Sequence, residues 1–250
     1  MAYAETFAGQ CAHAIGPLLD ALAPVPGVRL LDVGTGTGAV AAVALARGCP
    51  VTAVDPEPDM LALAAAAAPG ALLVQAGLPR LPFDDGTFGL VTANFVLNHV
   101  PDPASAAGEL CRVLADGGRL AASIWPTTPT PIRQLWDDVV RESGVPAPTA
   151  SIPAELDFPR TPEGLAGLLT SGGLTIERSW TQDFVHLVDA DLWWSGVTRG
   201  VAAIGQVWLN QDADGQAAMR SAYDDLARPF LGRDGLLHLP GAAVLAVAVR

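Results

Sequence analysis

A glycine-rich stretch is the first place where residue types and their spacing could do chemistry. Gly34, Gly36 and Gly38 directly follow the apolar run 28–33. Glycine adopts positive φ values without strain, and it lets a ligand come close to the backbone. Amide groups at the start of a following helix can then bind an anionic group. The stretch therefore predicts a sharp turn that binds the anionic end of a ligand.

Asp55 follows the glycine turn and stands at the end of the next apolar run. A carboxylate about 20 residues after such a turn can accept hydrogen bonds from both ribose hydroxyls. Its alternative role is to cap the helix that begins after Pro56. Together the turn and Asp55 predict a nucleoside site, but Gly34, Gly36 and Ala39 also fit the dinucleotide pattern G-x-G-x-x-G/A. These residues alone leave a nicotinamide or flavin enzyme open.

His99 is the candidate for acid-base chemistry, because it follows the fourth predicted strand on the side where ligands should bind. A neutral imidazole there could take a proton from an acceptor hydroxyl. A hydrogen-bonded scaffold histidine is the alternative. Asp32, beside the glycine turn, either holds the loop amides or contacts the ligand. Asp84 and Asp85 are expected in a solvated turn.

Composition excludes several classes of function. The formal net charge is −12 and all 14 basic residues are arginine, so Schiff-base chemistry on lysine is excluded and a nucleic-acid partner is disfavoured. No apolar run approaches the roughly 20 residues of a membrane span, and the first residues lack a secretory pattern, so we expect a cytoplasmic protein with no membrane partner. The scattered cysteines and histidines predict no metal site. These residues are Cys11, Cys49, Cys111, His13, His99, His186 and His238.

Alternating strands and helices must position these residues. Apolar runs bounded by glycine and proline predict five strands at 28–33, 50–54, 71–74, 87–94 and 119–125, and three helices at 39–47, 58–68 and 103–114. This alternation is typical of a Rossmann-like, doubly wound α/β fold with a mainly parallel sheet. Ligands bind beyond the carboxyl ends of such strands. We therefore expect function at Gly34, Asp55, Gly77 and Asn94.

The second half of the chain predicts two more strands, at 175–184 and 242–249, which makes the sheet seven-stranded. The proline-rich stretches 126–131 and 145–162 predict surface loops. A partly helical segment at 185–240 carries Trp193, Trp194, Trp208 and Tyr223, and it predicts a cap with an apolar acceptor pocket inserted between the last two strands. The expected domains are a helical lid segment at 1–27, a cofactor domain at 28–184 plus 241–250, and this cap.

Four blocks of residues carry a family resemblance. Residues 30–38 resemble the glycine-rich LLDVGxGTG motif of the class I S-adenosylmethionine-dependent methyltransferases, and 51–60 resemble their ribose-binding block. Residues 81–88 resemble the LPFxDxSFD block, and 94–103 with 112–120 resemble the fourth. The chain is most similar in these blocks to the ubiquinone and menaquinone biosynthesis methyltransferases, the methyltransferase type 11 group.

The resemblance implies a cofactor, S-adenosylmethionine, and a set of positions. Gly34, Thr35 and Gly36 would contact its methionine part, Asp55 its ribose, and Asn94 and Phe95 would close the pocket beneath the sulfonium. The adenine would lie against Pro56, Met60, Gly77 and Leu78. Gly77 stands where the family usually has an aspartate, and Asn98 where it often has the first histidine of a pair. Tyr3 and Phe7 would belong to the mobile lid.

The expected reaction is methyl transfer to a small, fairly apolar acceptor, with oxygen methylation as first choice and carbon methylation as second. His99 would be the catalytic base if the nucleophile is a hydroxyl. Three alternatives stay open: cyclisation or decarboxylation on the same fold and cofactor, a binding module without activity, and an NAD-dependent oxidoreductase. The chain could also form a homodimer.

Overall fold

The computed structural model describes residues 2–147, 153 and 156–250. They divide into two compact units. The sheet unit comprises the described residues of 11–127, 151–182 and 243–250. The helical unit comprises those of 2–10, 128–150 and 183–242. The predicted cap at 185–240 lies inside the helical unit, which also takes in residues near the amino terminus and around 140.

The sheet has seven strands in the order β3-β2-β1-β4-β5-β7-β6. β1 pairs in parallel with β2 and β4, β2 with β3, and β4 with β5, whereas β7 is antiparallel to β5. The predicted Rossmann-like, mainly parallel fold, with its insertion between the last two strands, is confirmed. The strands are β1 Leu30–Val33, β2 Val51–Asp55, β3 Leu72–Gln75, β4 Phe88–Asn94, β5 Leu114–Ile124, β6 Thr175–Val188 and β7 Leu237–Val249.

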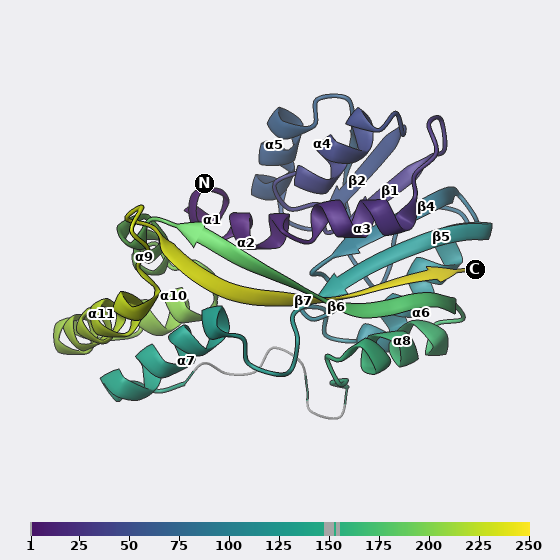
Figure 1. Ribbon diagram of the computed structural model, residues 1–250. Coiled ribbons are helices and arrows are strands. Elements are labelled where there is room, and N and C mark those ends of the chain that lie inside the picture. The colour runs from purple at the N-terminus through teal and green to yellow at the C-terminus, as the bar shows by residue number, and fades with distance from the viewer. Residues whose placement is uncertain (1, 148–152, 154–155) are drawn as a thin grey trace. The chain divides into compact units, whose positions relative to one another are not determined.

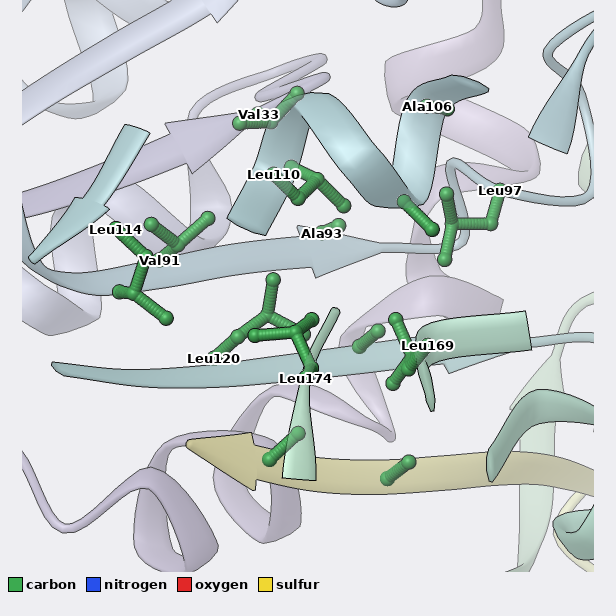
Figure 2. Packing of buried hydrophobic residues seen from close by; sticks show 14 of the residues in the cluster. Val33, Val91, Ala93, Leu97, Ala106, Leu110, Leu114, Leu120, Leu169 and Leu174 are labelled. Carbon is green, nitrogen blue, oxygen red and sulfur yellow. The ribbon is translucent and has the colours of Figure 1, made fainter. Parts of the chain in front are cut away.

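Helices cover both faces of the sheet (Figure 1). On one face lie α3 Ile15–Leu22, α4 Ala39–Ala46 and α5 Pro58–Ala67, and on the other lie α6 Pro103–Val113 and α8 Pro162–Ser171. Figure 2 shows Leu110 of α6 and Leu169 of α8 with side chains from β4 and β5, among them Val91 and Leu120. These four side chains are fully buried, so their removal from water stabilises this face of the sheet.

The starts of α6 and α8 follow directly from their sequences. Asp102 accepts a hydrogen bond from the N–H of Ser105 at 3.0 Å, and Pro103 occupies the first turn. Thr161 accepts from Gly164 N–H at 3.1 Å and Pro162 follows it in the same way. Proline loses no hydrogen bond at such a position, since the first amides of a helix have no partner within it.

Two helices occur where the sequence predicted loops or nothing. α7, Pro131–Ser143, begins at the end of the predicted loop 126–131, and α8 begins at the end of the predicted loop 145–162. In both cases the proline marks a helix start rather than a loop. Part of the second loop, at 148–152 and 154–155, lies outside the described residues.

Three strands are longer than predicted. β5 begins at Leu114 instead of residue 119, because the turn through Gly117 keeps strand pairing with β4 across an irregularity in register. β6 continues to Val188, and β7 begins at Leu237. Both extensions contain polar residues, such as His186 and His238, so a prediction based on apolar runs did not include them.

The helical unit is built from short helices around aromatic side chains. α1, Ala2–Thr6, and α10, Ala202–Leu209, both pack against α9, Ala190–Thr198. α11, Ala213–Ala227, packs against α7. The unit also contains the start of α2, Ala8–Ala12, and a 3-10 turn at Arg228–Phe230. The predicted helical character of the amino-terminal segment and of 185–240 is therefore present. Over the described part of the chain, none of the helices combines the length and apolarity of a membrane span.

Candidate functional site

The glycine turn lies between β1 and α4, as predicted. Gly34, Gly36 and Gly38 all have positive φ, at 64°, 54° and 83°. A side chain at Gly34 would come within 2.5 Å of Val96, and one at Gly38 within 2.7 Å of the backbone of Ala64. A side chain at Gly36 would meet nothing within 4 Å, so open space lies over the middle of the turn. Two of the glycines thus serve close packing, and the middle one leaves room for a ligand.

Asp32 holds this turn from below. Its carboxylate, 1% exposed, accepts hydrogen bonds from the hydroxyls of Thr35 at 2.7 Å and Thr92 at 2.8 Å. Burial raises the pKa of Asp32 to about 6, although the two hydroxyl hydrogen bonds lower it, and the nearby carboxylate of Asp55 raises it slightly further. Thr35 is fixed a second time, because its N–H donates to the carbonyl of Val54 at 2.9 Å. Two roles were considered for Asp32, and these contacts favour holding the loop over direct contact with the ligand.

Asp55 joins the glycine turn to the end of β2. Its Oδ2 accepts from the N–H of Gly36 at 2.8 Å, and its Oδ1 accepts from the N–H of Glu57 at 3.0 Å. Glu57 stands at the N-cap position of α5, so Asp55 organises both the turn and the next helix start. A carboxylate has about four acceptor positions, and these two bonds leave room for ribose hydroxyls. The two roles weighed for Asp55 are thus compatible with each other.

The predicted adenine residues lie at the ends of β2 and β3. Gly77 follows β3, and a side chain there would come within 3.3 Å of Pro56, which follows β2. A larger residue at 77 would therefore need Pro56 to shift. Met60 lies in the first turn of α5 and is partly buried, and Leu78 packs against the hydrophobic core. Small and apolar surfaces of this kind suit the flat face of a base.

Asn94 ends β4 and Phe95 follows it, and both are fixed by the neighbouring strand β5. Ser123 donates its hydroxyl to Oδ1 of Asn94 at 2.6 Å, and the Asn94 amide nitrogen donates to the carbonyl of Cys11 at 3.4 Å. The N–H of Phe95 donates to the Ser123 carbonyl at 2.9 Å. Phe95 has φ of 57°, unusual for a bulky residue, and its ring stacks on Trp125 with centroids 3.9 Å apart. Such strain persists only where surrounding contacts impose it.

Ser123 and Thr92 are site residues that sequence reasoning missed. Both hydroxyls are fully buried, and both lie within strands that were identified by their apolar residues. Buried polar groups in strands need partners, so a lone hydroxyl inside each apolar run was the available signal. The partner itself lies on another strand and is visible only in the fold.

His99 lies where it was predicted, in the loop after β4, one turn beyond Val96, whose carbonyl accepts from the His99 N–H at 2.8 Å. Its side chain is exposed at the protein surface. Desolvation by the protein around the ring, followed by the positive charge of Arg160, lowers the pKa of His99 below its ordinary value. The preceding Asn98 is buried, and its Oδ1 has no hydrogen-bond partner among the described residues.

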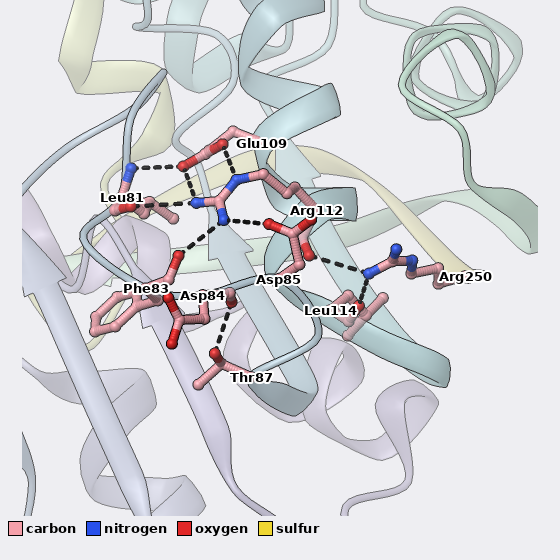
Figure 3. A network of polar contacts seen from close by, with 9 residues as sticks. All are labelled: Leu81, Phe83, Asp84, Asp85, Thr87, Glu109, Arg112, Leu114 and Arg250. Carbon is pink, nitrogen blue, oxygen red and sulfur yellow. Dashed lines mark hydrogen bonds and ion pairs between the residues drawn. The ribbon is translucent and has the colours of Figure 1, made fainter.

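Arg112 connects the third and fourth blocks of the resemblance, as Figure 3 shows. Its guanidinium donates to Glu109 at 2.7 and 2.8 Å, to Asp85 at 2.7 Å and to the Phe83 carbonyl at 2.8 Å. Glu109 in turn accepts from the N–H of Leu81 at 2.6 Å, and its pKa is lowered chiefly by the hydrogen bond from Arg112. These residues tie the loop before β4 to α6, so their role is to shape the scaffold.

Comparisons with known proteins fit this geometry. A family model described as a methyltransferase domain matches residues 31–122. These residues form a methyltransferase domain. The resemblance seen in the four sequence blocks is thereby confirmed, and the match favours S-adenosylmethionine, the cofactor of that family, over a dinucleotide. The methyltransferase domain contains the glycine turn, Asp55 and Asn94, and it ends within β5.

One relative and two solved structures illustrate the similarity. Over 130 residues the chain is 36% identical to a demethylmenaquinone methyltransferase of Clavibacter sepedonicus, an overlap of 51% of this chain and 53% of that protein. The chain spans about half the length of the curated relatives it matches. A putative methyltransferase from Bacillus halodurans superimposes with a TM-score of 0.61 at 21% identity, covering 94% of this chain and 97% of that one. A [4+2]-cyclase gives 0.57 at 20% identity, over 96% and 81%.

The residues of the site suit S-adenosylmethionine. The open space over Gly36 lies next to a carboxylate that is already oriented by the turn. Backbone amides at the start of α4 favour the carboxylate of the methionine part, and Asp55 has acceptor positions for a ribose. The negative charge of Asp55 also suits a cationic sulfonium.

Proposed function

We propose that this protein transfers a methyl group from S-adenosylmethionine to a small, fairly apolar molecule, with an oxygen as the first choice of acceptor atom and a carbon as the second. One observation carries the proposal: the hydrogen bond from Gly36 N–H to Asp55, within a domain that matches the methyltransferase family. It joins the anion-binding turn and the ribose-binding acid into a single preformed site. The name of the Clavibacter relative supports methyl transfer to a small molecule.

Each site residue has a proposed role in binding. Gly34, Thr35 and Gly36 bind the methionine part and Asp55 binds the ribose. Asn94 and Phe95 close the site beneath the sulfonium, held there by Ser123 and Trp125. The adenine lies against Pro56, Met60, Gly77 and Leu78. The cofactor, when bound, supplies an activated methyl group, so the chain's part is to align the acceptor and exclude water.

His99 is the proposed base for a hydroxyl acceptor. Its lowered pKa leaves the imidazole neutral at neutral pH, which is the form that can take a proton. Its surface exposure lets that proton pass on to solvent. A carbon or strongly acidic oxygen nucleophile would not need this step.

Calorimetry with S-adenosylhomocysteine tests the site. We expect Asp55→Ala to weaken binding about tenfold to a hundredfold, because charge-assisted hydrogen bonds to the ribose are lost. Asp59→Ala is the matched control, since Asp59 is an exposed acid in the first turn of α5. Thermal melting of each variant checks that it is folded. Unchanged affinity in a folded Asp55→Ala protein would remove Asp55 from the site.

Cofactor binding alone does not separate methyl transfer from cyclisation, because a cyclase shares this fold. We therefore expect label from methyl-labelled S-adenosylmethionine to appear in an organic-soluble product with a panel of phenolic and carbonyl-bearing aromatic probes. A product without label, formed while the cofactor stays intact, would instead assign a reaction that does not transfer the methyl group.

A further inference from the structure

Two loops leave the carboxyl ends of β4 and β5 beside the proposed cofactor site. Ser123 on β5 donates a hydrogen bond to Asn94 on β4, so the two strand ends are held next to each other. The first loop reaches His99 five residues after Asn94, and the second reaches Thr127 four residues after Ser123. Because a residue spans at most about 3.6 Å, both loops stay within about 18 Å of that hydrogen bond along the chain.

Thr127 fixes the backbone of Arg160, just before α8. The N–H of Thr127 donates to the Arg160 carbonyl at 2.9 Å, and the Arg160 N–H donates to the Thr127 hydroxyl at 2.8 Å. The next residue, Thr161, caps α8, so this backbone is held on both sides. Desolvation and then the positive charge of Arg160 lower the pKa of His99, so the guanidinium lies within electrostatic reach of the imidazole. All of these residues belong to the sheet unit.

The guanidinium of Arg160 is only partly used by the protein. Its Nη2 donates to Asp157 at 2.8 Å, and its carbon lies 6.0 Å from the centre of the Phe158 ring. Its Nη1 has no acceptor among the described residues and is not buried. The side chains of Arg160 and Asp157 are 26% and 38% exposed, so water weakens this ion pair. Arg160 therefore offers an accessible, positively charged donor to a further acceptor.

A guanidinium and a neutral imidazole together suit an acidic hydroxyl. The guanidinium only donates, and its strongest hydrogen bonds go to negatively charged oxygen. The imidazole can take the proton that such a hydroxyl releases. The positive charge of Arg160 favours the oxygen anion and, in the same position, favours the neutral form of His99. A cationic acceptor would be repelled from this charge.

We propose that Arg160 selects the acceptor by binding the ionised oxygen of an acidic hydroxyl, such as that of a phenol or an enol. The O–H bond breaks, its proton passes to the ring of His99 and on to solvent, and the oxygen keeps the electron pair. The inference rests on the proposed function in one respect: it names oxygen acids as the class of methyl acceptor. Binding of the anion itself needs only residues of the sheet unit.

A pair of probes that differ in charge tests this inference. Ionised 4-nitrophenol and 4-nitrotoluene have nearly the same shape, but only the first carries a negative oxygen. We expect the intact protein to bind ionised 4-nitrophenol about threefold to tenfold more tightly, the ratio for one charged hydrogen bond that is partly exposed. Arg160→Gln should lose this preference, and Arg160→Lys should keep part of it, because lysine retains the charge. Arg178→Gln is the matched control, since Arg178 is an exposed arginine of the same unit that lies over Trp180 at 4.4 Å.

A change of opposite sign separates this role from a structural one. Asp157 competes with the ligand for the guanidinium, so Asp157→Asn should raise the preference for ionised 4-nitrophenol. The unaltered protein provides a further measurement, because the visible absorbance of bound 4-nitrophenol should show ionisation at a lower pH than in water. Equal binding of the two probes, an unchanged preference in folded Arg160→Gln, or a preference that does not rise in folded Asp157→Asn would each overturn the inference.

The two proposals fail independently. If S-adenosylhomocysteine binds and Asp55→Ala weakens it, but the probes are bound equally, the anion site at Arg160 is wrong and the proposed function stands. If the preference for the anion and its loss in Arg160→Gln are observed but S-adenosylhomocysteine does not bind, the anion site stands and the proposed function is wrong.

Discussion

The two units of the chain differ in what their interiors are built from. In the sheet unit, Asp32, Asp55 and Asn94 each accept hydrogen bonds from nearby backbone or hydroxyl groups of the same unit. In the helical unit, Trp136 and Trp193 are buried with donors that no described residue satisfies. The first arrangement is a frame of hydrogen bonds, whereas the second is a set of packed aromatic rings. A polar frame that is already hydrogen-bonded needs little rearrangement when a ligand binds, which lowers the cost of binding.

His99→Gln should have the largest effect, and it tests whether the sheet unit does chemistry as well as binding. If His99 is the base, the single-turnover rate of methyl transfer to a hydroxyl should fall by about 10² to 10⁴, with S-adenosylhomocysteine affinity nearly unchanged. His238→Gln is the control, because His238 is an exposed histidine that contacts Asp234 at 3.0 Å. A near wild-type rate in folded His99→Gln enzyme would mean that no general base acts from this position. Proximity and the activated methyl group would then account for the rate.

The same base has a predictable pH dependence. The His99 pKa is lowered, and the neutral form is the active one, so activity should persist as pH falls through the ordinary histidine range near 6.5. It should be lost only at lower pH, when the pKa of His99 itself is crossed. If activity is already lost at a pH above the ordinary histidine pKa as the pH is lowered, the assignment of His99 as the base is wrong.

Asp32→Asn should have an intermediate effect, on stability. The folded-state pKa of Asp32 is about 6, above the ordinary 3.8, so the folded state binds the extra proton between these values. Stability from this group is therefore fully present below about pH 4 and is lost as pH rises through 6, by on the order of 3 kcal/mol. Asp32→Asn should remove that part of the pH dependence. Urea unfolding of both proteins at pH 4, 5, 6 and 7 measures it, and parallel profiles would contradict it.

Tyr223→Phe should have the smallest effect, and it tests what one buried hydrogen bond contributes to the helical unit. Loss of the hydrogen bond to the Ala190 carbonyl should lower the free energy of unfolding by about 1 kcal/mol. Urea unfolding of both proteins measures this difference, and an unchanged free energy of unfolding in Tyr223→Phe would contradict it.

Local patterns made most of the sheet unit predictable. Gly34 and Asp55 could be placed because a positive φ and a strand-end acid are local requirements, and the apolar runs located the strands to within a few residues for β1 to β4. The start of β5 and the helices α7 and α8 were not predicted. Glycine and proline there were interpreted as breaks, whereas the fold uses them at a strand irregularity and at helix starts.

Contacts between distant parts of the chain could not be predicted in this way. The sequence singled out Trp193 but not Trp136, which lies between two proline-rich stretches and meets the Trp193 ring only because α7 packs within the helical unit. The hydroxyl of Ser123 likewise has a role only because β5 pairs with β4 beside Asn94. Both depend on tertiary neighbours, for which one sequence contains no local signal.

The strand order also bears on how the chain is made. β7 lies between β5 and β6 in the sheet, yet it is the last of the three to leave the ribosome. Until residues 243–249 have been synthesised, β5 has an unpaired edge and the sheet-unit part of β6 has no neighbour to join. Unpaired strand edges are sites of wrong pairing during folding. The nascent protein is therefore exposed to aggregation until β7 has been synthesised and this single strand closes the gap between β5 and β6.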